Sequence, residues 1–506
     1  MCYIVQGVRL WRSLAGFLGE RSHALAGLRW VLIQIALLGL MGSAPPVSGA
    51  PTPETRDPFG TERYVPSAPG MRWQPSVPLP AVPESQGVRL PAGDRPLTLP
   101  ELTEIALQNN PRTRQAWYGA RAAAAGIGIE EAGLLPQITG TVSLQRSEQG
   151  GQAGNQIAWL TRYGPSITLS YLLYDFGVQT NQVKAAEYVA LAAALAQNRV
   201  LQDVVFQVEQ AYYRFLGAEQ LVRSNELFLK SVRTSLDATQ RRREAGLATV
   251  ADVYRAETQV AQAQLNLTRS RGEVEKARGS LASAVGLPVN AALRVQLLQG
   301  EPRIREISES LADILGRAKA SRPDLVAAEA QARAARAQAD ATANSGLPTI
   351  TLNATTGRTY FRGDRPLTET NNLTLNLNIP IFTGFNHTYS VRQAEARAAQ
   401  AEAARDVLSR QTELEVWQSY YDVQTAAGGV STTAVQLRAA QQTAEATLAR
   451  YQAGFGSLLD LITAQVDESN ARVQRIQSYL DWFTAVARLN FAIGVSDHTD
   501  YSIQSR

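Results

Sequence analysis

The chain has 506 residues, of which 45% are hydrophobic and 19% charged, so it can bury a large core. Its 49 Lys and Arg residues outnumber its 45 Asp and Glu residues, but four of the arginines and one of the acids lie within residues 1–50. The rest of the chain is therefore almost neutral, which excludes the basic stripe that nucleic-acid binding requires.

The first 49 residues have the layout of a secretory signal peptide. A basic segment precedes an apolar run from Trp30 to Met41, and small residues and prolines follow it. The apolar run is too short to span a bilayer as a helix, and we place the cleavage site after Gly49. The one cysteine, Cys2, lies inside this segment, so the mature chain is expected to have no thiol and no disulfide.

Residues 50–97 are rich in proline, which predicts a disordered lead-in rather than a domain. After residue 50 the sequence has no uncharged apolar stretch of about eighteen residues, so any membrane crossing is expected to be made by strands. Residues 496–506 are expected to form a C-terminal tail.

The remaining sequence repeats one pattern twice, over residues 98–300 and 301–495. Matching residues are 212 positions apart before the strand hairpins and 208 positions apart after them. The offset then stays constant over more than a hundred residues. This constancy indicates an internal duplication. The second repeat is therefore four residues shorter than the first at this point, and we expect its strand hairpin to be the shorter one. Matching pairs are Asn110-Pro111 with Arg322-Pro323, Leu135-Pro136 with Leu347-Pro348, Tyr212-Tyr213 with Tyr420-Tyr421, and Asp252 with Asp460.

Each repeat is predicted to contain a helix, a strand hairpin (136–175 and 348–383) and two long helices joined by a tight reversal. Within the hairpins aliphatic residues alternate with short uncharged polar residues, as in a strand between lipid and a wet lumen. A soluble sheet with one buried face gives the same alternation, but two equivalent hairpins behind a signal peptide favour the membrane. Aromatic residues expected at the membrane interface are Trp159, Tyr163, Tyr360 and Phe361.

Four strands cannot close a barrel around a pore, which takes about eight strands even when the barrel is packed solid. An unpaired strand edge in lipid would leave bare N–H and C=O groups. The strand count therefore predicts that several copies of the chain share one barrel.

The first long helix is expected to run from about Val178 to Arg241, or about 95 Å at 1.5 Å per residue. An apolar seam of three-four spacing follows it from Leu201 and is interrupted only by Asn225. This pattern indicates a coiled coil. An extended coiled-coil rod fits the helices equally well, but it does not explain the strand hairpins.

These features together resemble the TolC family of outer-membrane export proteins, over about residues 98–495. The most specific strings are the reversals Arg242–Leu247 followed by Asp252, and Arg450–Phe455 followed by Asp460. The resemblance implies a mixed α/β membrane protein: a homotrimer with a twelve-stranded β-barrel in the outer membrane, continued by a long α-helical tunnel in the periplasm.

The resemblance further implies a passive exit channel for type I protein secretion or multidrug efflux. Its expected partners are outer-membrane lipid, a periplasmic adaptor protein, and an inner-membrane pump of the ABC or proton-driven class. The helical tips near 241–252 and 449–460 are expected to face the adaptor. The expected docking residues are Ala245, Gly246, Leu247, Ala453, Gly454 and Phe455.

By the same resemblance, Asp460 matches an aspartate that rings the narrowest aperture, and Tyr451 matches a tyrosine that latches the closed tip. The family's second ring aspartate falls on Thr463, and its latching arginine falls on Gly456. Arg450 or the cluster 241–243 is a candidate substitute for that arginine. Asp252, the repeat twin of Asp460, is placed in the same set of aperture and gating residues. From the residues alone, both aspartates are also good helix-capping residues, and for Asp460 the two roles are compatible.

The sequence carries no sign of enzyme chemistry. With three histidines and no mature cysteine it offers no His/Cys metal cluster, and it has neither a phosphate-binding G-x-x-x-x-G-K-[ST] loop nor a G-x-S-x-G elbow. We expect a protein that is not an enzyme and needs no cofactor. The alternatives to an exit channel are a periplasmic adaptor protein and a structural coiled-coil protein.

Overall fold

The computed structural model describes residues 95–149, 158–291, 293–297, 304, 309–362 and 366–495. The chain divides into two units, Met1–Ser85 and Gln86–Arg506, and every described residue belongs to the second. The expected signal peptide, the lead-in up to residue 94 and the C-terminal tail lie outside the described residues. Leu97, at the end of the expected lead-in, is buried and forms a parallel bridge with Val295.

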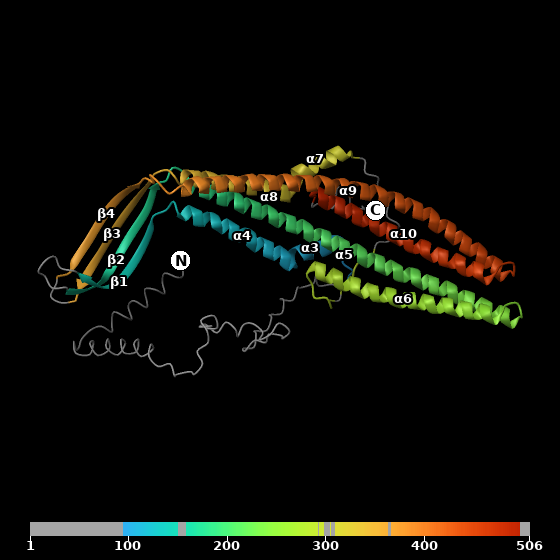
Figure 1. Ribbon diagram of the computed structural model, residues 1–506. Coiled ribbons are helices and arrows are strands. Elements are labelled where there is room, and N and C mark those ends of the chain that lie inside the picture. The colour runs from blue at the N-terminus through green and yellow to red at the C-terminus, as the bar shows by residue number, and fades with distance from the viewer. Residues whose placement is uncertain are drawn as a thin grey trace, which may run out of the picture. The chain divides into compact units, whose positions relative to one another are not determined.

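Helices and strands follow one another in the same order in both repeats (Figure 1). The paired helices also have equal lengths, namely 11, 22, 67 and 36 residues. The first repeat contains α3 (Leu99–Asn109), α4 (Pro111–Ala132), β1 (Gln137–Gln149), β2 (Ala158–Tyr174), α5 (Val178–Glu244) and α6 (Val250–Val285). The second contains α7 (Leu311–Ser321), α8 (Pro323–Asn344), β3 (Thr349–Phe361), β4 (Thr368–Asn378), α9 (Asn386–Gln452) and α10 (Leu458–Ile493).

Proline and glycine set several helix boundaries. Pro111 and Pro323 occupy the first turns of α4 and α8, where a missing N–H costs nothing, and they force the preceding residue into an extended conformation that ends α3 and α7. Gly286 and Gly494 end α6 and α10 with φ of +83° and +85°, a left-handed conformation that favours glycine.

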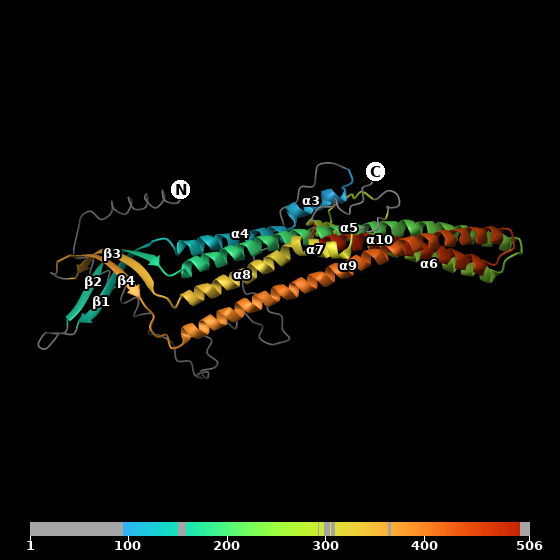
Figure 2. The same cartoon turned by 90° about the horizontal axis from the view of Figure 1, so that it is seen from above.

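The long helices pack side by side: α5 lies against α4, α6 and α8, and α10 lies against α9 and α5 (Figure 2). At 1.5 Å per residue, α5 and α9 are each about 100 Å long. The expected seam on α5 is confirmed, because Val204, Val208 and Val232 are fully or almost fully buried. Asn225, which interrupts the seam, is buried and its side-chain amide lies 3.5 Å from the carbonyl oxygen of Asn266 on α6.

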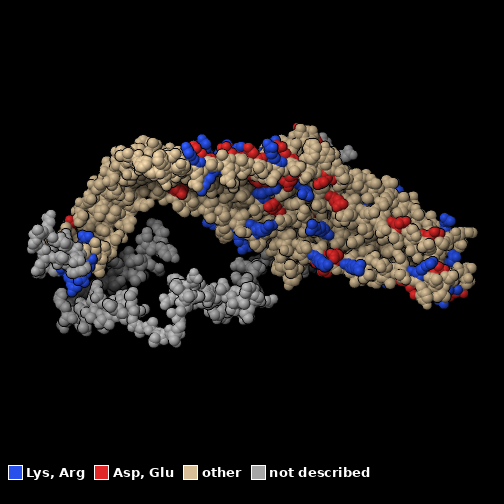
Figure 3. Space-filling view, viewed as in Figure 1, with Lys and Arg blue, Asp and Glu red and all other residues tan. Residues whose placement is uncertain are grey.

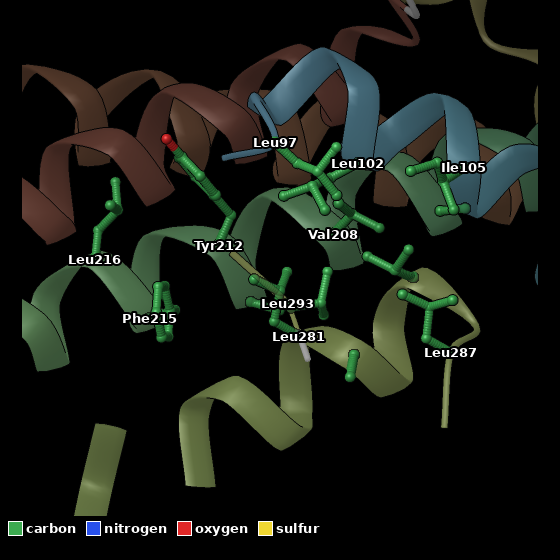
Figure 4. Close-up of a cluster of buried hydrophobic side chains, with 14 of the residues drawn as sticks. Leu97, Leu102, Ile105, Val208, Tyr212, Phe215, Leu216, Leu281, Leu287 and Leu293 are labelled. Carbon is green, nitrogen blue, oxygen red and sulfur yellow. The ribbon is translucent and has the colours of Figure 1, made fainter. Parts of the chain in front are cut away.

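The largest apolar cluster joins α3, α5 and α6 (Figure 4). Leu102, Val208 and Leu281 are its fully buried centre. A second cluster repeats it between α7, α9 and α10, at the equivalent residues Ile314, Val416 and Leu489. The two repeats therefore bury the same positions. Along the helices that the structure describes, no 18-residue window is both apolar enough and poor enough in charge to cross a bilayer.

The four strands form one antiparallel sheet in the order β1-β2-β3-β4. Among the described residues, β1 and β4 have no further strand partner, so both edges of the sheet are open. The aliphatic face is uncovered as well: Val142 on β1 is 84% exposed and Leu373 on β4 is 72% exposed. A soluble sheet buries such a face, whereas this sheet presents it to its surroundings. The expected fold, four strands continued by long helical hairpins, is confirmed.

The strand pairing shows on which face of the sheet the aromatic residues expected at the membrane interface lie. Tyr163 and Tyr360 are directly opposite each other and stack with ring centroids 5.6 Å apart. Phe361 is paired with Arg162. Because neighbouring residues of a strand point to opposite faces, Phe361 lies on the polar face and the interface role expected for it is wrong. The side chain of Trp159 lies outside the described residues.

Gly164 on β2 is required by a close approach of the two central strands. A Cβ atom added there would lie 1.8 Å from the backbone oxygen of Arg358 on β3. We therefore expect Gly164→Ala to separate β2 from β3 and to lower the free energy of unfolding by about 3 kcal/mol, the upper end of the usual cost of overpacking. The measurement is the yield and thermal stability of folded protein in detergent. Gly140→Ala, where an added Cβ meets nothing within 4 Å, is the matched control and should behave like the unaltered chain.

Candidate functional site

The reversal between α5 and α6 is a Schellman motif, the commonest glycine-based ending of a helix. Gly246 has φ of +73°. The N–H of Leu247 donates to the carbonyl of Arg242 at 2.7 Å, and the N–H of Gly246 donates to that of Arg243 at 2.9 Å. The sequence Ala245-Gly246-Leu247 thus closes the helix and turns the chain within a few residues.

The reversal between α9 and α10 repeats this geometry. Gly454 has φ of +88°, and the N–H of Phe455 donates to the carbonyl of Arg450 at 2.9 Å. Ala453 is the last residue before the glycine, in the place of Ala245 in the first reversal. Together the two reversals, residues 241–252 and 449–460, are called the helical tip below.

The tip leaves its apolar turn residues uncovered. In a Schellman motif the residue after the glycine often packs back onto the helix, but here Leu247 is 68% exposed and Phe455 is 81% exposed. Leu459, in the first turn of α10, is exposed as well. Both reversals therefore present apolar side chains at the end of the helices, where the described part of the chain does not cover them.

Asp252 and Asp460 are both the third residue of their helices rather than the capping residues. The caps are Thr249 and Ser457, whose hydroxyls accept the N–H groups of the two aspartates at 3.2 and 3.1 Å. Asp252 accepts both the hydroxyl and the N–H of Thr249, and these bonds, the hydroxyl first, hold the pKa of Asp252 below its usual value. Asp460 accepts the hydroxyl of Ser457 at 2.7 Å and is exposed.

Tyr451 connects the second hairpin to the first. It is only 3% exposed and packs with Ala256, Leu458 and Leu461. Its hydroxyl lies 2.9 Å from the hydroxyl of Thr239 on α5. Because Thr239 donates its own hydrogen to the carbonyl of Ser235 at 2.7 Å, the Tyr451 hydroxyl is the donor of the pair.

Arg242, in the last turn of α5, makes two further contacts with the same tyrosine. Its guanidinium carbon lies 4.7 Å from the centroid of the Tyr451 ring, a cation–π contact, and its Nη1 donates to the Tyr451 carbonyl. The Nε atom of Arg242 is buried and has no hydrogen-bond partner in the structure. An arginine of the first hairpin thus holds the end of α9.

A third contact lies on α10. The side-chain amide of Gln465 donates to the hydroxyls of Ser231 and Ser235 on α5, both at 2.8 Å. Gln465 is 3% exposed. Together with Arg242 and Tyr451 it forms what we call the interhairpin latch, which joins α5 to both helices of the second hairpin.

The remaining expected site residues take no part in this latch. Gly456 lies against the end of α9, where an added Cβ would be 3.2 Å from the Tyr451 nitrogen. Thr463 is exposed, and its hydroxyl donates to the carbonyl of Leu459 at 2.9 Å. Thr239 and Gln465 were not found from the sequence. A polar residue at a seam position of a long helix was the available signal for Gln465.

Comparisons with known proteins agree with this geometry. The sequence pattern of the family described as "Outer membrane efflux protein" matches residues 102–287 and 314–495. Protein CyaE of Bordetella pertussis is 29% identical over 395 residues, which cover 76% of this chain and 82% of CyaE. Outer membrane efflux protein BepC of Brucella suis is 25% identical over 393 residues, covering 77% of this chain and 83% of BepC.

The solved structure of the outer-membrane channel OprN is similar in fold. It superposes with a TM-score of 0.71 at 21% identity, and the match covers 78% of this chain and 89% of OprN. Neither a periplasmic adaptor nor a structural coiled-coil protein accounts for a family match that spans both repeats. The chain belongs to the outer membrane efflux protein family.

Proposed function

We propose that three copies of this chain form a passive export channel in the outer membrane. Each copy contributes four strands to a twelve-stranded barrel, and the helices continue it as a tunnel across the periplasm. The observation that carries the proposal is the open four-stranded sheet with an uncovered aliphatic face. Both sheet edges and that face find partners only in other copies and in lipid.

The gate of this channel is assigned to the helical tip. In the closed state the interhairpin latch holds α9 and α10 against α5. Opening moves the second hairpin outward and breaks the contacts of Arg242, Tyr451 and Gln465. Asp460 stays exposed and, repeated around the threefold axis, forms a ring of three carboxylates at the aperture, which favours cations.

The exposed apolar residues of the tip support docking of a periplasmic adaptor protein. Leu247 and Phe455 are carried on rigid reversals and exposed to solvent in the isolated chain, as expected of a surface that a partner covers. An inner-membrane pump of the ABC or proton-driven class then supplies the energy. That pump selects the cargo, a secreted polypeptide or a small drug.

The aperture is tested by single-channel recording of the purified protein in planar bilayers. We expect Asp460→Asn to reduce the preference for cations over anions severalfold, because three carboxylates are removed from one narrow ring. Asp252→Asn, the same change at the repeat twin, is the control and should leave ion selectivity unchanged. Equal selectivity of the Asp460 variant and the unaltered protein would remove Asp460 from the aperture, and a protein that stays monomeric in detergent would contradict the channel itself.

A further inference from the structure

The uncovered face of the sheet is not apolar along its whole length. By the strand register, Leu144 on β1, Ala354 on β3 and Leu373 on β4 are the last aliphatic residues on this face before the hairpin ends. Charged residues follow on the same face, since every second residue of a strand points the same way. They are Arg146 on β1, Arg358 on β3 and Glu369 on β4. Arg362 comes directly after the last residue of β3 and is exposed.

Figure 3 shows the same division: the sheet surface in this view is uncharged over most of its length, and basic side chains gather at its far end. That end is remote from the helices, because the strands leave and rejoin the helices at the other end (Figure 1). In an outer-membrane protein with periplasmic helices, the basic end lies at the headgroups of the outer leaflet.

A hollow of about 270 Å³, lined by both polar and apolar residues, opens on this face. Its lining includes Pro165, Ile167, Thr356, Arg358, Glu369 and Asn371. The β2–β3 pairing runs on either side of Gly164 and Pro165 but not across them. Proline has no N–H to donate, so the ladder is interrupted where the hollow lies.

The guanidinium group of Arg358 bonds Glu369 and is oriented to bind a further group. Its Nε donates to Oε1 of Glu369 at 3.0 Å, which fixes the guanidinium plane and leaves the fork of Nη donors outside that bond. Such a fork matches the oxygens of a phosphate. The backbone N–H of Arg362 donates to the carbonyl of Thr161 at 3.0 Å, so the backbone of this second arginine stays beside β2.

We propose that the hollow and the two arginines, Arg358 and Arg362, bind the phosphorylated headgroup of an outer-leaflet lipid. The phosphate bonds the guanidinium groups, and the acyl chains lie along the aliphatic residues Ile167, Ala354 and Leu373. Continuity of the hollow with the aliphatic face favours a lipid over a soluble anion. The inference rests on the outer-membrane location of the sheet and not on the gate at the tip.

The test is a titration of the purified, full-length protein with lipid A that carries two phosphates, followed by native mass spectrometry. We expect the double variant R358Q/R362Q to bind about 25-fold more weakly, because each lost arginine costs about fivefold near an anionic surface. Glu369→Gln should strengthen binding about fivefold, because a negative charge beside the phosphate is removed. A folding defect would not strengthen binding.

Arg162→Gln is the matched control, since Arg162 lies on the opposite face of β2 and bonds Gln145. It should bind lipid A like the unaltered protein. Lipid A stripped of its phosphates should bind as weakly to the unaltered protein as intact lipid A binds to the double variant. The proposal is overturned if the double variant binds normally, if the Arg162 variant loses as much, or if inorganic phosphate displaces the lipid. Single-channel conductance of the same preparations is expected to be unchanged, which separates this site from the gate.

Discussion

Arg242→Ala is expected to shift the channel strongly toward its open state. The change removes the cation–π contact with Tyr451 and the charge-assisted hydrogen bond to its carbonyl. Contacts of these kinds together contribute about 2 kcal/mol or more when partly buried, so the ratio of open to closed channels should rise at least about thirtyfold. The measurement is the open probability of single channels in planar bilayers.

The control for charge is Arg243→Ala, an exposed arginine one residue further along the same helix end. It should leave the open probability unchanged. Tyr451→Phe gives an intermediate case, because it removes only the hydroxyl that bonds Thr239 and should raise the open-to-closed ratio about fivefold. If the Arg242 and Arg243 variants behave alike, net charge at the tip and not the latch controls opening.

Arg322→Met is expected to lower the free energy of unfolding by about 3 kcal/mol, because it leaves Glu415 without this ion pair and Asp324 with only the longer pair to Arg199, at 3.7 Å. Arg322 is 3% exposed, and its guanidinium bonds Asp324 at 2.6 and 3.0 Å and Glu415 at 2.6 Å. It also donates to the carbonyl of Ala492 at 3.1 Å. One side chain thus ties α8, α9 and the end of α10 together. The measurement is chemical unfolding followed by helical circular dichroism in detergent.

Repeat 1 provides the natural comparison for this arginine. Asn110 takes the place of Arg322, and its amide donates to the carbonyl of Ala284, the residue equivalent to Ala492, at 3.0 Å. Arg322→Asn introduces the bonding group of the first repeat and should still be destabilising, because Asp324 and Glu415 both lose their ion pair with Arg322. Arg333→Met, at an exposed ion pair on α8, should change little. An equally small effect at Arg322 would show that solvent already satisfies Asp324 and Glu415.

The cost of losing Arg322 is expected to depend on pH. Burial alone would raise the pKa of Asp324, but the hydrogen bonds and charge of Arg322, together with the charge of Arg199 and the N–H of Leu325, outweigh it and hold the pKa below its usual value. A depressed pKa adds stability above about pH 4, and this contribution is lost as the pH falls through the folded-state value. The unaltered protein and the Arg322 variant should therefore converge in stability in acid. Asp203, whose pKa is raised by burial, acts in the opposite direction in both proteins.

Much of the fold followed from the sequence because it depends on local periodicity. The two-residue alternation of the strands, the three-four seam of α5 and the Ala-Gly reversals each fix a conformation within a few residues. The constant offset between repeats then required two copies of the same arrangement. Even the need for other copies of the chain followed from counting strands, since four cannot close a barrel.

Contacts between residues far apart in the chain needed the tertiary structure. The family resemblance points to Tyr451 as a latching residue but does not say that Arg242, rather than Arg241 or Arg243, reaches it, because three successive residues point in three directions around a helix. The error at Phe361 was of another kind: the alternation that starts at Ile350 and Leu352 already puts Phe361 on the polar face, and only its pairing with Arg162 depends on the register.

The sequence by itself therefore determined the class of protein, the repeat and the elements, since these depend on the order of side chains along one strand or helix. Only the tertiary structure decided which charged groups meet, at the latch, at Arg322 and in the hollow beside Arg358. Such contacts depend on the rotation and the relative shift of two packed elements, and the packing of the whole unit sets both.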